Sequence, residues 1–264
     1  MLARDWLYRR TDMRTEEFMA VISEASKENE RFEQLRTGLP LGKDVSENIV
    51  VSQKREKPLT VRNTCVTGKW STIFIRRLAV TLSCLYDKHE ACFFVLSPRA
   101  EYGELLRLRS ADVTVPYIHT KEDLENAVKT LKELIEMRKE GKGYPRLILI
   151  LDGLDELPEC NENGDFEEYR NIYDIVMRRT DVDIITGAEL MKSIFSGYPG
   201  AFVGVGNCLV STREEGKADV TYVNDDSSLT LPLPMSYPSE PSIMESIIFL
   251  NSVPGIAPEQ TDEE

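Results

Sequence analysis

Histidine and cysteine are scarce in this sequence, and their spacing does not suit metal binding. The 264 residues include two histidines, His89 and His119, and five scattered cysteines with no C-x-x-C pair. Structural zinc needs such ligands at short spacings, and a disulfide framework normally has an even number of cysteines. We therefore expect neither zinc nor disulfides, and the free thiols favour a reducing, cytoplasmic compartment.

Long apolar runs and an excess of positive charge are also missing. Since no apolar stretch approaches the roughly 18 residues of a membrane helix, we expect no membrane segment. The start, MLARDWLYRRTDMR, has no apolar stretch behind its basic residues, so we expect no secretory signal. Lys and Arg number 32 against 45 Asp and Glu, a formal net charge of −13. Because such a field repels nucleic acid, DNA binding is disfavoured.

The chain does contain a repeating order of strand and helix patterns. Its hydrophobic fraction of 41% and charged fraction of 29% are typical of a soluble globular protein. Continuous apolar runs such as RLILIL (146–151) predict buried parallel strands, and apolar residues at helical spacing predict the helices between them. The alternation predicts an α/β fold with a mostly parallel central sheet, an N-terminal helix and a β-rich C-terminal part.

These patterns also give the expected boundaries. Strands are expected at 49–52, 60–66, 91–96, 112–118, 146–151 and 182–186, then in AFVGV, CLVS, DVTYV and LTLPL. Helices are expected at 11–36, 71–87, 121–140, 166–179 and 242–251. We divide the chain into an N-terminal helical segment (1–38), an α/β domain (39–252) and a disordered acidic tail (253–264).

VTGKWSTIFI, residues 66–75, stands where a nucleotide-binding α/β fold carries its phosphate loop, between a strand and a helix. That loop has the form G-x-x-x-x-G-K-[ST]. With Gly68 as the first glycine, the remaining motif positions fall on Ile73, Phe74 and Ile75. The second glycine, the phosphate-binding lysine and the magnesium-binding hydroxyl are then all missing. Lys69 is nearby but five residues too early.

The strongest chemical motif is LILILDGLDELPE, residues 147–159. Nucleotide hydrolases hold magnesium beside the phosphates with an acidic residue at the end of an apolar strand, and Asp152 has that position. An ordinary buried strand followed by a polar turn would show the same pattern. Asp155 and Glu156 lie further along the turn.

Several segments, in order, resemble the motor domain of the FtsK/SpoIIIE family of DNA translocases. LPLGKDVSENIVV (39–51) is similar to the segment that precedes that family's motor core. VTGKWSTIFI and SCLY (83–86) align without a gap with its phosphate loop and the helix end that follows. Later family motifs are matched by VLSPRAEY (95–102), LKELIEMRK (131–139), DGLDEL (152–157), GAEL (187–190) and GVGN (204–207). The resemblance covers about residues 39–250 and implies a RecA-like P-loop ATPase fold.

The resemblance also implies where the chemistry would lie, and there the sequence departs from the family. The implied phosphate-loop residues are Gly68, Lys69, Ser71 and Thr72, and the implied magnesium residue is Asp152. Gly153 replaces the hydrolytic Glu of the family, and the family's water-sensing Gln has no counterpart. We therefore expect a pseudo-ATPase with degenerate Walker A and Walker B motifs and no catalytic residue.

No cofactor is expected, and any residual ligand would be ATP with magnesium. The apolar side chains of Ile73, Phe74 and Ile75 would fill the empty nucleotide pocket and stabilise the domain through burial. Such a pattern is typical of a domain kept for assembly or partner binding.

Three functional interpretations stay open. One is an active ATP-driven DNA translocase with an aberrant loop. Another is a signalling ATPase of the NACHT class, whose acidic strand is similar to LILILDGLDEL and in which Asp155 and Glu156 would be catalytic. The third, which we favour, resembles the degenerate motor domains of type VII secretion: an assembly, regulatory or docking module of a translocation, secretion or conjugation motor. Its partners would be other motor-type ATPase subunits or protein substrates, in a homo- or hetero-oligomer.

Overall fold

The computed structural model describes residues 39–46, 48–52, 62–86, 88–109, 111–138, 144–157, 172, 175–176, 181–187, 208–222, 229–239 and 243–252. The expected N-terminal helix, most of the expected helix 166–179 and the acidic tail lie outside the described residues.

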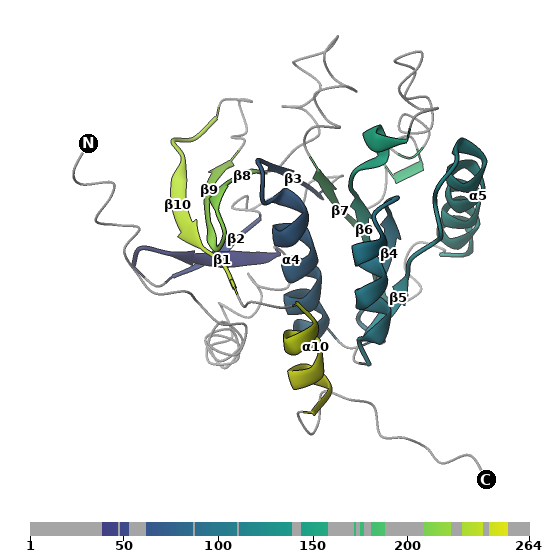
Figure 1. Ribbon diagram of the computed structural model, residues 1–264, viewed down its shortest axis with the longest axis horizontal. Helices are drawn as coiled ribbons and strands as arrows, with labels where there is room; N and C mark the ends of the chain where they lie inside the picture. The colour runs from purple at the N-terminus through teal and green to yellow at the C-terminus, as the bar shows by residue number, and fades with distance from the viewer. Residues whose placement is uncertain are drawn as a thin grey trace.

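A large mixed sheet forms the centre of the described chain (Figure 1). Its strands are β1 (Pro40–Asp44), β2 (Ile49–Val51), β3 (Arg62–Thr67), β4 (Ala91–Leu96), β5 (Asp112–Thr114), β6 (Arg146–Leu151), β7 (Val182–Gly187), β8 (Cys208–Glu214), β9 (Lys217–Tyr222) and β10 (Leu233–Ser236). Their order is β2-β1-β10-β9-β8-β3-β7-β6-β4-β5. The part from β8 to β5 is parallel, whereas β9, β10, β1 and β2 continue the sheet by antiparallel pairing.

Helices cover both faces of the parallel part. They are α4 (Ser71–Leu85), the 3-10 helix η1 (Ala100–Arg107), α5 (Lys121–Met137), the short 3-10 helix η2 (Leu154–Glu156) and α10 (Ile243–Ser252). The buried side chains of α4, η1 and α10 belong to one hydrophobic cluster, and those of α5 belong to another. Figure 1 shows α10 beside the C-terminal half of α4, with α5 at the far side of the sheet's β4–β6 region.

Alternation along β6 explains this two-layer burial. Ile148 and Ile150 pack in the cluster of α4, and Leu147, Leu149 and Leu151 pack in the cluster of α5. Successive side chains of a strand point to opposite faces, so a strand covered on both sides must be apolar throughout. The predicted α/β fold with a mostly parallel central sheet is confirmed, as is the β-rich C-terminal part.

Some local predictions were wrong. The strand expected at 112–118 ends at Thr114, ahead of Pro116, which has no backbone N–H to donate to a neighbouring strand. The 3-10 helix η1 and the strand β1 were not predicted, because neither has an apolar period long enough to be recognised. Within the described residues, none of the helices has the length and apolar character needed to cross a membrane.

Candidate functional site

The turn between β3 and α4 has three residues, Gly68, Lys69 and Trp70, and it packs tightly against β8. Gly68 has a φ of 97°, and a Cβ there would lie 2.3 Å from the carbonyl oxygen of Thr212. The backbone N–H of Trp70 donates to the hydroxyl of Thr212 at 3.3 Å, and that hydroxyl donates to the carbonyl of Thr67 at 2.7 Å. Thr212 therefore closes the turn from the β8 side.

Thr72, in the first turn of α4, contacts Asp152 at the end of β6. Its hydroxyl donates to Oδ2 of Asp152 at 2.9 Å. Strand β7 lies between β3 and β6, and a Cβ on its last residue, Gly187, would lie 2.4 Å from Oδ1 of Asp152. The glycine thus leaves the space through which the carboxylate reaches α4.

Two further side chains donate to the same carboxylate oxygen. Nη1 of Arg99, which follows β4, lies 2.9 Å from Oδ2 of Asp152. The hydroxyl of Tyr102, in η1, also donates to this oxygen at 2.9 Å. Asp152 is 3% exposed and Tyr102 is fully buried. Three donors from two segments, the start of α4 and the start of η1, therefore converge on one buried oxygen.

Burial dominates the electrostatics of this cluster. It raises the pKa of Asp152 above its ordinary value, although the charge of Arg99 and the hydrogen bonds from Thr72 and Tyr102 oppose the shift. The pKa of Tyr102 is raised well above its ordinary range, first by burial and then by the neighbouring carboxylate, so the phenol stays a donor. The pKa of Arg99 is also raised, mainly by its hydrogen bond to Glu156, and its guanidinium stays charged.

Arg99 also pairs with Glu156, at the end of η2. Its Nε and Nη2 donate to the two carboxylate oxygens at 3.2 Å and 2.5 Å, so the guanidinium forms a two-pronged contact. Gly153 makes this approach possible: its φ is 68°, and a Cβ there would lie 2.7 Å from Nε of Arg99. Glu156 is exposed, whereas the Asp152 end of the arrangement is not.

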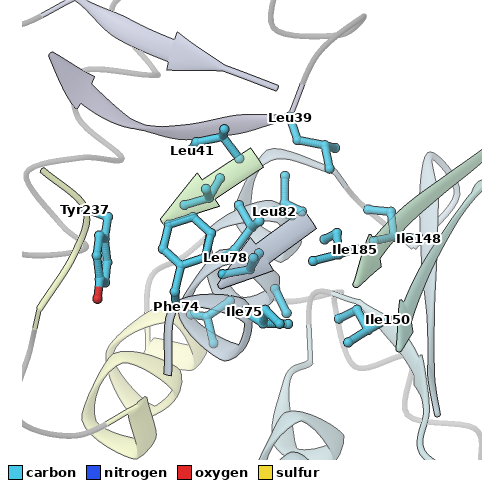
Figure 2. Packing of buried hydrophobic residues seen from close by; sticks show 14 of the residues in the cluster. Leu39, Leu41, Phe74, Ile75, Leu78, Leu82, Ile148, Ile150, Ile185 and Tyr237 are labelled. Carbon is cyan, nitrogen blue, oxygen red and sulfur yellow. The ribbon is translucent and has the colours of Figure 1, made fainter. Parts of the chain in front are cut away.

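Of the three apolar side chains expected to fill a nucleotide pocket, Phe74 and Ile75 are buried in the hydrophobic core instead. Phe74 is 1% exposed and its ring lies edge-on to Tyr237, with centroids 4.8 Å apart. Ile75 is fully buried in the same cluster, on the face of α4 that packs against the sheet (Figure 2). Ile73 is partly buried. The helix starts at Ser71, and from its first turns Phe74 and Ile75 point to the core.

The structure brings some of the predicted site residues together and leaves others apart. Thr72 and Asp152 are in contact, Gly68 makes the turn and Ser71 begins the helix. Lys69 is exposed, with its ammonium group 5.4 Å from the centroid of the Trp70 ring. Arg99 and Tyr102 were not predicted as site residues. The sequence feature that points to them is their position just after a buried strand, because the carboxyl ends of parallel strands meet at one edge of a sheet.

The residues present do not fit a magnesium triphosphate held in the P-loop manner. Such a loop wraps backbone N–H groups around phosphate, whereas here the N–H of Trp70 is directed to Thr212. Magnesium would need oxygen ligands at Asp152, whose Oδ2 already receives the guanidinium of Arg99. Across the described residues, no group of three or more His, Cys, Asp or Glu side chains is placed to hold a metal ion.

Solved structures of ATPases resemble this chain in fold. No protein-family model matches the sequence, and no curated protein matches it. One similar structure is an ATPase with a TM-score of 0.60 and 14% identity, covering 87% of this chain and 95% of that chain. Another is the cytoplasmic domain of the Thermomonospora curvata type VII secretion ATPase EccC, with a TM-score of 0.54 and 10% identity. That match covers 85% of this chain but 32% of EccC's cytoplasmic domain.

Identities this low establish the fold alone. The chain has the fold of these ATPase structures, and the resemblance in its sequence predicted an ATPase fold.

Proposed function

We propose that this chain is a motor-fold domain that does not hydrolyse ATP and that serves as an assembly, regulatory or docking module of a translocation, secretion or conjugation motor. In this proposal Thr72 and Asp152 are the remnants of a magnesium site, because P-loop enzymes place a Ser/Thr hydroxyl and an acidic residue next to each other on the metal. Thr72, rather than Ile75, is then the counterpart of the motif hydroxyl.

The observation that carries the proposal is the closed three-residue turn at Gly68, Lys69 and Trp70. It is shorter than the loop G-x-x-x-x-G-K needs, it is filled from the β8 side by Thr212, and it sends no lysine to the start of α4. A turn that cannot surround a β-phosphate gives ATP little to bind, so hydrolysis has no substrate complex from which to start.

Two measurements on the purified chain test the loss of nucleotide chemistry. The first is phosphate release from ATP with magnesium, with and without DNA; the second is the thermal midpoint with and without millimolar Mg·ATP. A ligand at 100 times its Kd stabilises by about 2.7 kcal/mol and raises the midpoint of a domain of this size by roughly 5–10 °C. We expect no shift of that size and no release above the buffer rate.

The Asp152→Asn variant is the matched control for both measurements. A trace of contaminating ATPase would give the same release in wild type and variant. Release that requires Asp152, or a midpoint shift that the variant loses, would refute the loss of hydrolysis and favour an active translocase.

The docking role is tested by co-precipitation with an intact motor-type ATPase from the same cell. Support for the role comes from the structural likeness to a type VII secretion ATPase, EccC, of whose cytoplasmic domain this chain covers 32%. We expect a complex that forms equally with and without ATP. A chain that stays monomeric and captures no motor subunit would count against the role.

The alternative of a NACHT-class signalling ATPase has less support. It places helical domains after the acidic strand, whereas β8, β9 and β10 occupy residues 208–236 of the described chain. Its proposed catalytic acid Glu156 is paired with Arg99.

A further inference from the structure

The cation beside Asp152 comes from the chain itself. Nη1 of Arg99 lies 2.9 Å from Oδ2 of Asp152, and the other two guanidinium nitrogens contact Glu156. The carboxylate of Asp152 is almost completely buried, where an uncompensated negative charge would be very costly. A full positive charge at hydrogen-bond distance provides that compensation.

The backbone is shaped around this pair. Both Gly153 and Gly187 occupy places where a Cβ would collide with it, at 2.7 Å from Nε of Arg99 and at 2.4 Å from Oδ1 of Asp152. Gly153 has in addition a positive φ of 68°, which a side chain would strain. Two separate positions, the end of β7 and the turn after β6, therefore need glycine for the same contact, so the pair is a feature of the fold and not an incidental surface bridge.

The pair also joins segments that are distant in sequence. Arg99 begins the segment after β4, Asp152 ends β6 and Thr72 opens α4, and their side chains meet at one oxygen. Tyr102, in the helix η1 that Arg99 caps, donates to the same oxygen. In nucleotide hydrolases a magnesium ion and its phosphates connect the phosphate loop with the acidic strand end. Here the connection is made by side chains alone.

We propose that Arg99 is a built-in counter-ion: its guanidinium takes the position beside Asp152 that magnesium takes in a working nucleotide hydrolase, and it holds the ends of β4 and β6 against α4 with no ligand bound. This inference rests on the proposed function, because a domain that bound Mg·ATP would need that position for the ion. It explains how a motor domain keeps its nucleotide edge assembled without nucleotide. The carboxyl ends of β4 and β6 then keep a single conformation, which a partner protein can bind.

A double-mutant cycle tests the pairing. Arg99→Met removes the charge and keeps the stem, and we expect it to lower the thermal midpoint by roughly 5–10 °C. In an Asp152→Asn background the same change should cost less than half as much, because no buried carboxylate is left uncompensated. Arg107→Met, which removes an arginine from the end of η1, is the matched control and should cost little in either background.

The response of the thermal midpoint to Mg2+ distinguishes a counter-ion in the magnesium position from a merely structural ion pair, which would not change that response. With millimolar MgCl2, compared with NaCl at equal ionic strength, wild type should keep its midpoint. Arg99→Met should gain stability from Mg2+, and the double variant should not. If Arg99→Met does not fold, Arg99→Lys, which keeps the charge and loses the two-pronged contact, replaces it in the cycle, with an intermediate loss of midpoint expected.

Independent, additive effects of the two substitutions would overturn the proposal, and so would a wild type that responds to Mg2+ as strongly as Arg99→Met does. A folded Arg99→Met that ignores Mg2+ would show that the guanidinium does not stand in an ion's position. These failures are distinct from failure of the proposed function, which would appear as Asp152-dependent phosphate release by wild type with the coupling left intact.

Discussion

At the scale of single residues, the turn that replaces a phosphate loop depends on Gly68. Its positive φ and the Thr212 carbonyl 2.3 Å from the site of a Cβ leave no room for a side chain. We expect Gly68→Ala to lower the free energy of unfolding by about 2–3 kcal/mol, measured by urea denaturation. Gly103→Ala is the matched control, because a Cβ there meets nothing within 4 Å. Equal losses in both variants would contradict this account.

The residues of the site were predictable only in part. Asp152 could be found because an acidic residue directly after a continuous apolar strand is a local pattern. Arg99 and Tyr102 also follow a buried strand, but that position did not reveal their contacts with Asp152, which join residues 53 and 50 positions apart in the chain. Which strand ends meet depends on the sheet order, and a sequence does not state that order. Thr72 was proposed as a vestige of the loop, yet its partner was unknown for the same reason.

At the scale of elements, the apolar side chains of α4 join this helix to the rest of the hydrophobic core. Phe74 packs edge-on against Tyr237, which follows β10, so it links the helix to the antiparallel part of the sheet. We expect Phe74→Ala to cost about 3–5 kcal/mol in the free energy of unfolding, because the site is closely packed. Ile248→Ala on α10, where the side chain is 63% exposed, is the control and should cost less than about 0.5 kcal/mol. A small loss for Phe74→Ala would mean that its ring is not buried as described.

Helix α5 starts with a capping box whose carboxylate makes stability depend on pH. Asp123 accepts hydrogen bonds from the backbone N–H groups of His119 and Thr120, at 3.0 Å and 2.9 Å, and these bonds lower its pKa. A lowered pKa in the folded state means that the stabilisation is present above the unfolded value of 3.8 and is lost as pH falls through the folded value. We expect wild type to lose its advantage over Asp123→Asn as the pH falls below that value, as measured by urea denaturation across the acid range.

The other half of the same box provides the comparison for this experiment. The hydroxyl of Thr120 accepts from the N–H of Asp123 at 3.1 Å. Thr120→Ala should cost about 1 kcal/mol at neutral pH and keep much of the acid dependence, because both backbone donors to the carboxylate remain. A constant difference between wild type and Asp123→Asn at every pH would show that the carboxylate is not stabilised by the cap.

Long periodic elements were predicted well, and short ones were not. The boundaries of β4 and β6 agree with their apolar runs, because a strand buried on both faces leaves an unbroken pattern. Strand β1 contains Pro40 and Gly42 and lies in the antiparallel part of the sheet, so nothing in its composition marks it as a strand. A Cβ at Gly42 would lie 2.3 Å from the carbonyl of Ser236 in β10, a close approach that explains the glycine once the pairing is known.

At the scale of the whole molecule, the parallel and antiparallel parts of the sheet share one core. The cluster on the α4 face includes Leu41 and Met235 from the antiparallel strands as well as Ile148 and Ile185 from the parallel ones. In Figure 2, Leu41 lies to one side of the buried side chains of α4, and Ile148 and Ile185 lie to the other. Because of this common core, we propose that residues 39–252 form one domain.

A buried arginine reinforces this junction. Arg77 of α4 is 6% exposed, and its guanidinium donates to the carbonyl of Pro238 at 2.7 Å and to Glu215, in the β8–β9 turn, at 2.8 Å. The helix that follows the parallel strand β3 is thus tied to the far ends of the antiparallel strands. Separation of the two parts would leave this charge without its partners and expose the shared apolar surface.

The two parts should therefore unfold together, although chains of this length often unfold in steps. In a Trp6→Phe background, Trp70 is the remaining tryptophan and reports on the turn at β3, while far-UV circular dichroism reports on all elements. We expect the two signals to give the same urea midpoint. Arg77→Met should lower both urea midpoints by the same amount. The substitution removes the contacts of the guanidinium but keeps the shared hydrophobic core, so the two parts of the sheet still unfold together. If the Trp70 signal changed at a different urea concentration from the circular dichroism, the parallel and antiparallel parts would be separate folding units, and a single domain over 39–252 would be wrong.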